Sequence, residues 1–333
     1  MNAITRRVTL GLAALAAPTL GRAQTLKPAS LRLDWALSGY HVPFFWAKEK
    51  GYFAAEGINL EIRDGAGSAK AASLVSSKED TFGMVEALVT ANSIARGMKL
   101  RSIYMVVQNG GAAIVSWAAK PMKTPQDMVG RSLAAAADQK PQLDLLLAMN
   151  GIPSDKVTLR VVAVAARNQV FFQGQVEGIV STVIGSPMDM IVAAREGRGQ
   201  PIHIMPFSDF GVRSLAQGFV VHEDLARENP EQVRGFLRAC TKGIRDCMAP
   251  GNLDAATDIA MQLSRAPSTR RESVKLQWEA TIPRLWTEAN KDKPLGWTSE
   301  ADWANLVDLL LKQQAIPAAV PANTLFTNAF IPA

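Results

Sequence analysis

The chain alternates short strand patterns with longer helical patterns, and this order constrains its fold more than any other feature of the sequence. Leu31, Leu33 and Trp35 are apolar residues at every second position, which is typical of a strand. A helical pattern then runs over residues 42–50 and ends at Gly51. A repeated strand-helix order predicts an α/β fold with open, parallel sheets and helices on their faces.

The alternation continues along most of the chain. We expect further strands at residues 58–62, 81–83, 100–107, 113–118, 132–136, 158–164, 178–183, 202–205 and 218–221. Helices are expected between them at residues 68–77, 86–96, 125–130, 141–150, 168–173 and 187–196. The remainder is almost wholly helical, with patterns over residues 230–248, 252–263, 270–289 and 299–313. A helical segment this long without strands of its own is expected to pack on the first lobe.

The motif Asn109-Gly110-Gly111 interrupts the first series, and a second strand-helix series of about 90 residues follows it. We therefore expect two α/β lobes, with residues 24–110 and 212–333 in lobe 1 and residues 111–211 in lobe 2. The chain is expected to cross between them twice, near residues 108–113 and 206–213. Two facing lobes form a ligand cleft that can close by a hinge motion.

Residues 1–23 have the pattern of an export signal peptide. Arg6 and Arg7 give a charged start, residues 8–17 are apolar and small, and small residues precede the expected cleavage point. The arginine pair is compatible with twin-arginine export, and an ordinary Sec signal is the alternative. The apolar run of about 10 to 12 residues is shorter than the roughly 20 that span a membrane. We expect a soluble periplasmic protein that begins near Gln24.

Charge and cysteine content argue against a nucleic-acid-binding protein and against a fold held by disulfides. Residues 1–23 hold three arginines and no acid, so 33 basic and 30 acidic side chains remain and the charge is +3. A nucleic-acid partner is therefore not expected. Cys240 and Cys247 lie on one expected helix at a distance of about 10 Å, too far apart for a disulfide. We expect both to be small core residues.

Open α/β sheets bind ligands beyond the carboxyl ends of their strands, so site residues are expected there. Asp34 and Trp35 are expected to end the first strand, and Tyr40 and His41 precede the next helix. The two aromatic rings are suited to enclose a flat molecule, while Asp34 or His41 bonds its edge. The alternative is that Trp35 belongs to the core and His41 only caps the helix.

Two further candidates follow the second and third strands of this lobe. The turn that contains Gly67 and Ser68 can direct backbone N–H groups towards a ligand, although it can also be a simple tight turn. A dinucleotide site is not expected, because Lys70 stands where that fingerprint has its third glycine. Glu86 follows a short strand and either contacts the ligand or supplies a favourable charge at a helix start.

In the second lobe, Asp138 and Ser181 occupy the corresponding strand ends and are expected to close over the ligand. The equally good alternatives are that Asp138 lies in a solvated loop and that Ser181 belongs to a pair of residues that cap a helix. Asn109, at the first crossing, completes the predicted ligand-binding residues. No catalytic motif or pair of histidines at metal-binding spacing was found, and His203 lies far along the chain from the other two histidines. We therefore expect binding without catalysis, metal or cofactor.

Residues 33–57 resemble the opening of a known family, most specifically at Lys50-Gly51-Tyr52-Phe53 and at Glu56-Gly57. The family comprises solute-binding proteins of ABC importers for nitrate, sulfonates, taurine and thiamine-pyrimidine precursors, with the fungal pyrimidine synthases related to them. Similar segments recur at residues 67–68, 82–97, 124–131, 174–178 and 229–239. The resemblance implies a type II periplasmic binding fold, a monomer, and delivery of a small-molecule ligand to an ABC permease in the inner membrane.

The chain departs from the synthases of this family at two positions. Those enzymes carry a lysine that holds pyridoxal and a histidine four residues later, where this chain has Val85 and Val89. Their cysteine-rich iron motif is also missing, so the resemblance implies binding alone. A synthase-like enzyme and the periplasmic partner of a two-component sensor remain alternatives. The acceptors Asp34 and Glu86 favour a nitrogen-containing or aromatic solute such as a pyrimidine precursor over a sulfonate or taurine-type compound.

Overall fold

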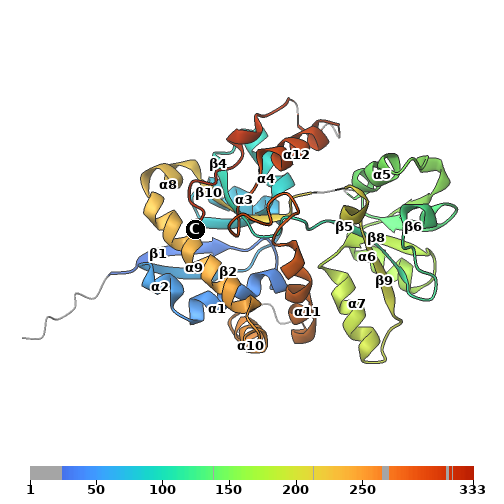
Figure 1. Ribbon diagram of the computed structural model, residues 1–333, viewed down its shortest axis with the longest axis horizontal. Coiled ribbons are helices and arrows are strands. Elements are labelled where there is room, and N and C mark those ends of the chain that lie inside the picture. The colour runs from blue at the N-terminus through green and yellow to red at the C-terminus, as the bar shows by residue number, and fades with distance from the viewer. Residues whose placement is uncertain (1–24, 138, 213, 265–269, 313–314, 317) are drawn as a thin grey trace, which may run out of the picture.

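The computed structural model describes residues 25–137, 139–212, 214–264, 270–312, 315–316 and 318–333. The expected export signal at residues 1–23 and the candidate Asp138 lie outside the described residues. The chain forms two mixed five-stranded sheets, each packed with helices into a lobe (Figure 1). Among the described residues, no helix has both the length and the apolar character needed to cross a membrane.

The first sheet has the order β2-β1-β3-β10-β4. Its strands are β1 (Lys27–Arg32), β2 (Ile58–Arg63), β3 (Phe82–Glu86), β4 (Leu100–Met105) and β10 (Gln217–His222). β1 is parallel to β2 and β3, as expected, whereas β10 is antiparallel to both β3 and β4. The expectation of an all-parallel sheet is therefore wrong at β10, which returns from the second lobe and enters the sheet from its other end.

The second sheet has the order β7-β6-β8-β5-β9. Its strands are β5 (Ala112–Trp117), β6 (Ser132–Ala135), β7 (Thr158–Val161), β8 (Gly178–Thr182) and β9 (Ile202–Pro206). β6, β7 and β8 are parallel, and β5 is antiparallel to β8 and β9. Both sheets thus contain one strand that runs against its neighbours.

Helices cover both sheets (Figure 1). Those of the first lobe are α1 (Val42–Glu49), α2 (Tyr52–Ala55), α3 (Ser68–Ser76) and α4 (Ala87–Ala95). Those of the second are α5 (Lys140–Met149), α6 (Val164–Phe172) and α7 (Ser186–Arg195). Single 3₁₀ turns are η1 (Gly39–His41), η2 (Pro125–Met128), η3 (Ser154–Lys156), η4 (Phe207–Phe210), η5 (Ile282–Arg284) and η6 (Ala322–Thr324).

The C-terminal helices are α8 (Glu223–Glu228), α9 (Pro230–Met248), α10 (Leu253–Leu263), α11 (Arg271–Thr281) and α12 (Glu300–Lys312). α9 and α10 pack on α1, and α12 packs on α4. α11 contacts η1 of the first lobe and α7 of the second. The expected helix over residues 270–289 is too long, because Pro283 removes a backbone donor and the α-helix ends at Thr281.

The chain passes between the lobes twice, and the two connections lie side by side. Backbone N–H groups of Val106 and Val107 both donate to the Gln217 carbonyl at 2.9 Å, and Ala216 N–H donates to the Val107 carbonyl at 3.0 Å. The Ser214 hydroxyl donates to the Gly110 carbonyl at 3.3 Å. The two crossings are therefore joined to each other by hydrogen bonds as well as to the sheets.

Candidate functional site

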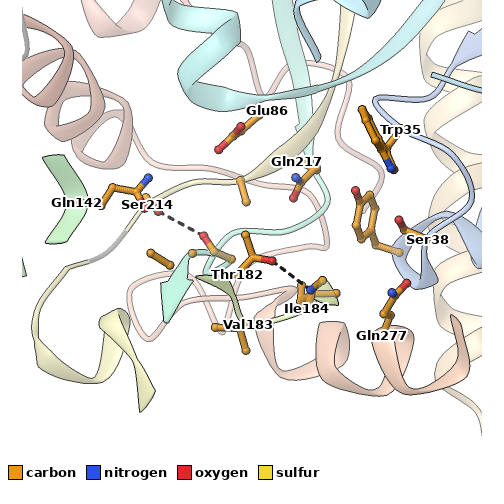
Figure 2. Close-up of a pocket in the computed structure, with 16 residues that line it drawn as sticks. Trp35, Ser38, Glu86, Gln142, Thr182, Val183, Ile184, Ser214, Gln217 and Gln277 are labelled. Carbon is orange, nitrogen blue, oxygen red and sulfur yellow. Dashed lines mark hydrogen bonds between the residues drawn. The ribbon is translucent and has the colours of Figure 1, made fainter. Parts of the chain in front are cut away.

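A cavity of about 260 Å³ lies between the two lobes and beside both crossings (Figure 2). The first lobe contributes Trp35, Ser38, Tyr40, Glu86, Gln217 and Gln277. The crossings contribute Gly110, Gly111, Ser214 and Ala216, and the second lobe contributes Ala112, Gln142, Thr182, Val183, Ile184 and Gly185. A molecule held here contacts both lobes at once.

Trp35 and Tyr40 line the cavity on the first-lobe side. β1 ends at Arg32, so Trp35 lies in the bend that follows the strand instead of at its end. The Trp35 side chain is 59% exposed, which removes it from the core. Tyr40 lies in η1 and is partly buried.

Asp34 and His41 lie behind Tyr40 and do not line the cavity. Both are buried, with exposed fractions of 5% and 0%. The Tyr40 hydroxyl donates to Asp34 Oδ2 at 3.0 Å, and His41 Nε2 lies 2.8 Å from Asp34 Oδ1. Burial and the Asp34 carboxylate raise the pKa of Tyr40 well above its usual value, so the phenol keeps its proton. His41 also accepts the Ser38 N–H and closes the turn that begins η1, as its alternative reading predicts.

Glu86 ends β3 and lines the cavity, whereas Gly67 and Ser68 are not among the lining residues. The Ser68 hydroxyl accepts the backbone N–H of Glu86 at 3.1 Å. Gly67 N–H donates to the Asp34 carbonyl at 2.7 Å, and Gly67 has a φ of 111°, which favours glycine. Gly65 N–H also donates to the Trp35 carbonyl at 3.0 Å, so this turn supports the loop that carries Asp34 and Trp35.

Of the candidates outside the first lobe, neither Ser181 nor Asn109 lines the cavity. Neighbouring strand residues point to opposite faces, so Thr182 faces the cavity while Ser181 is buried beside Arg167 and Ser186. Asn109 is partly buried, and its backbone N–H donates to the Arg284 carbonyl at 3.3 Å.

Three glutamines of the cavity were not predicted from the sequence, because none follows the carboxyl end of an expected strand: Gln142, Gln217 and Gln277. Gln217 opens β10 and pairs with Glu86, because an antiparallel strand brings its amino end to the carboxyl edge of its neighbours. Gln142 and Gln277 come from helices α5 and α11, and Gln277 Oε1 accepts the Gly39 N–H at 2.8 Å. Gln217 could have been predicted as a cavity residue only if the antiparallel direction of β10 had been known.

The lining has a distinct chemical character. It contains one carboxylate, three side-chain amides, several hydroxyls and two aromatic rings, and within the described residues no Lys, Arg or His lines it. Carboxylate and amide oxygens accept hydrogen bonds, and aromatic faces attract flat or cationic groups. In the described part of the chain, no group of three His, Cys, Asp or Glu side chains is placed to hold a metal ion. The cavity is therefore suited to a neutral or cationic polar ring compound.

Comparison with known proteins gives relatives of this chain. A family model described as "NMT1/THI5 like" matches residues 38–251. The riboflavin-binding protein RibY of Chloroflexus aurantiacus is 25% identical over 97% of this chain and 92% of that protein. The 4-amino-5-hydroxymethyl-2-methylpyrimidine phosphate synthase of Schizosaccharomyces pombe is 21% identical over 79% of this chain and 80% of that enzyme.

Solved structures share the fold at low sequence identity. The putative periplasmic sulfonate-binding protein SsuA from Methylobacillus flagellatus superposes with a TM-score of 0.69 at 13% identity, over 92% of this chain and 93% of its own. The periplasmic nitrate-binding protein NrtA from Synechocystis gives a TM-score of 0.59 at 15% identity, over 92% and 87%. The fold is thus that of the periplasmic binding proteins, with two α/β lobes and a cavity between them.

Proposed function

Because the chain belongs to the NMT1/THI5-like family and has the periplasmic binding protein fold, we propose that it is the solute-binding component of an ABC importer in the periplasm. It captures a small organic solute between its lobes and delivers it to the membrane permease. The cavity supports this proposal, because its walls come from both lobes and from both crossings. A ligand that contacts both lobes favours their closed arrangement by the difference between its affinities for the closed and open forms. The export signal expected at residues 1–23 agrees with a periplasmic location.

We propose further that the solute is a nitrogen-containing aromatic ring compound. The observation that carries this is the lining, where the aromatic rings of Trp35 and Tyr40 lie with the side-chain amides of three glutamines. A sulfonate or nitrate ion is held by cationic or dense N–H donors, which this lining lacks among the described residues. Pockets for drug-sized ligands have volumes of roughly 300–1,000 Å³. A cavity of about 260 Å³ suits a smaller compound of one or two rings.

The names of the relatives agree with this class of ligand. One is named for binding riboflavin and another for making a substituted aminopyrimidine phosphate, and both names denote nitrogen heterocycles. A synthase-like activity is the second candidate, because several relatives are named as synthases. Val85 is buried in β3 and Val89 lies on α4, so the positions that correspond to the lysine and histidine of the synthases offer no amine or imidazole.

The proposal is tested with the mature protein and four probes: 4-amino-5-hydroxymethyl-2-methylpyrimidine, riboflavin, taurine and nitrate. Binding to the folded state raises the unfolding temperature, so we expect a shift with the aminopyrimidine and none with taurine or nitrate. Glu86→Gln removes the charge of the acceptor and is expected to weaken aminopyrimidine binding about tenfold. Mass spectrometry of the released compound separates binding from catalysis, since a receptor returns it unchanged. Shifts with taurine or nitrate alone would contradict the ligand class, and a chemically altered compound would contradict the receptor. A periplasmic sensor partner would bind equally well but would leave uptake of the compound by cells unchanged on gene deletion.

A further inference from the structure

We infer that the buried pair His41 and Asp34 sets the hydrogen-bonding polarity of the cavity by fixing the Tyr40 hydroxyl as an acceptor towards the ligand. These two residues do not line the cavity and act as positioning residues behind it. The inference rests on the proposed function, because it specifies that a hydrogen-bond donor of the solute, and not an acceptor, faces Tyr40.

The first step is the tautomer of His41. The Ser38 backbone N–H donates to His41 Nδ1 at 3.0 Å, so Nδ1 carries a lone pair and the proton of the neutral ring is on Nε2. His41 Nε2 lies 2.8 Å from Asp34 Oδ1 and therefore donates to it. The imidazole is completely buried, so water does not compete for either ring nitrogen.

The second step concerns the other oxygen of Asp34. Asp34 Oδ2 lies 3.0 Å from the Tyr40 hydroxyl, and an ionised carboxylate only accepts hydrogen bonds. Tyr40 must therefore donate its single proton to Asp34. The Asp34 main chain is held as well, because its carbonyl accepts the Gly67 N–H at 2.7 Å. The remaining lone pairs of the phenol oxygen face Ser38, whose side chain also bonds to this oxygen, and the cavity that both residues line.

The consequence is a preference for donor-bearing solutes. An amine or ring N–H of the ligand can donate to Tyr40, whereas a carbonyl at the same place brings two acceptors together with no proton between them. A site built around a particular hydrogen bond rejects analogues that cannot make it much more strongly than an apolar pocket does. Asp34 and His41 thus select a ligand that they do not touch.

Asp34→Asn tests this directly, because it reverses the polarity of the phenol at nearly constant volume. His41 still presents Nε2–H, so the amide oxygen of the new side chain faces His41 and its NH₂ group faces Tyr40. Tyr40 then accepts from the amide, and its own proton is free to point into the cavity. The probes are 4-amino-5-hydroxymethyl-2-methylpyrimidine and its 4-oxo counterpart, which has a carbonyl where the first has an amine. We expect the ratio of their Kd values to shift by about tenfold or more towards the 4-oxo compound.

Two matched variants control for general damage. Asp64→Asn makes the same change in the nearby turn, at a side chain that does not line the cavity, and is expected to keep the wild-type ratio. In a Tyr40→Phe background, Asp34→Asn is expected to leave the ratio unchanged, since the hydroxyl through which it acts is gone. A ratio that is the same in wild type and Asp34→Asn overturns the inference.

The tautomer of His41 can be measured without a ligand, so the inference can be tested even if no probe binds. ¹⁵N NMR of histidine-labelled wild-type protein is expected to show His41 with a protonated Nε2 and an unprotonated Nδ1. The reverse tautomer, or a doubly protonated ring, overturns the inference even if every probe binds. Absence of binding by all four compounds of the thermal panel counts against the proposed function alone, so the two failures are distinguishable. The NMR result also remains decisive if Asp34→Asn does not fold.

Discussion

Trp35 lines the cavity and is 59% exposed, whereas Trp278 and Trp303 are completely buried in the core. An exposed ring adds little to the stability of the empty protein but gains much when a flat ligand covers it. Tyr40, by contrast, is partly buried and is fixed by the hydrogen bond from its hydroxyl to Asp34 Oδ2. At the scale of residues, the site therefore combines one adaptable aromatic ring with one fixed ring.

Trp35→Ala is expected to weaken ligand binding by about 1–3 kcal/mol, because the stacking surface is lost. The free energy of unfolding should change by less than about 0.5 kcal/mol, since the side chain is mostly exposed. Calorimetric titration and urea denaturation measure the two quantities. Trp35→Phe, the control, should retain part of the affinity, and an unchanged Kd in Trp35→Ala would show that the indole does not contact the ligand.

At the scale of elements, the sequence pattern predicted most strands and helices, because alternation and Gly or Pro breaks are local signals. It did not predict that β10 runs antiparallel between β3 and β4, since strand direction within a sheet depends on contacts between distant segments. For the same reason Trp35, Tyr40 and Glu86 were found near strand ends, whereas Gln217 and Gln277 were not. A helix face also does not reveal which of its polar residues meets a cavity.

The packing of α1 on α9 depends on a glycine. A Cβ atom at Gly243 would lie 2.3 Å from the Pro43 carbonyl oxygen and 2.8 Å from Ala47 Cβ, so the two helices would have to separate. We expect Gly243→Ala to lower the free energy of unfolding by about 1–3 kcal/mol, despite its better helix propensity. Gly235→Ala on the same helix is the control, because its nearest neighbour would be Glu56 Cβ at 3.2 Å, a much milder approach than the 2.3 Å at Gly243. Equal stability of the two variants in urea denaturation would contradict this account.

Asp80 joins three strands of the first sheet, and its side chain is fully buried. It accepts hydrogen bonds from Arg32 on β1 at 2.8 Å and from Arg63 on β2 at 2.9 Å. Burial alone would raise the pKa of Asp80, but hydrogen bonds from Arg32 and Ser30 and the charges of both arginines lower it. As the pH falls, the Asp80 carboxyl group is protonated in the unfolded chain before it is protonated in the folded protein. The stabilisation from Asp80 is therefore complete above about pH 4 and is lost as the pH falls further.

Asp80→Asn is therefore expected to cost about 2 kcal/mol at pH 7, because two charged hydrogen bonds are lost but both arginines are partly exposed and remain hydrated. It should also make the free energy of unfolding less dependent on pH below about pH 4. Denaturation at a series of pH values measures both effects. Asp144→Asn breaks the exposed pair with Lys140 and should be nearly neutral. An unaltered acid dependence in Asp80→Asn would assign that dependence to other carboxyl groups.

At the scale of the whole molecule, α7 and α11 approach each other across the gap between the lobes (Figure 1). Glu196, which follows α7, lies 3.9 Å from Arg270, which precedes α11, and both side chains are about half exposed. An exposed ion pair of this kind contributes little and is screened by salt. Apolar packing joins the lobes as well, since Val183 and Ile184 of the second lobe belong to the same buried cluster as the core of the first.

Small-angle scattering should show a smaller radius of gyration when the aminopyrimidine is added, because the bound compound draws the two lobes together. Taurine, expected not to bind, serves as the control. Glu196→Gln should change the Kd by no more than about twofold. An identical scattering curve with and without a compound whose binding has been demonstrated would exclude closure by the ligand.

The hydrogen bonds between the two crossings limit how the halves of the molecule can move. Because Val107, Ala216 and Gln217 link one strand of the connection to the other, twisting or sliding of one half against the other would break these bonds. Bending of the paired ribbon keeps them intact. These bonds therefore favour bending as the motion between the halves. Solute binding should appear in stopped-flow tryptophan fluorescence as one exponential phase after the collision step, and the part of the signal due to Trp35, one of seven tryptophans, should be missing in Trp35→Ala.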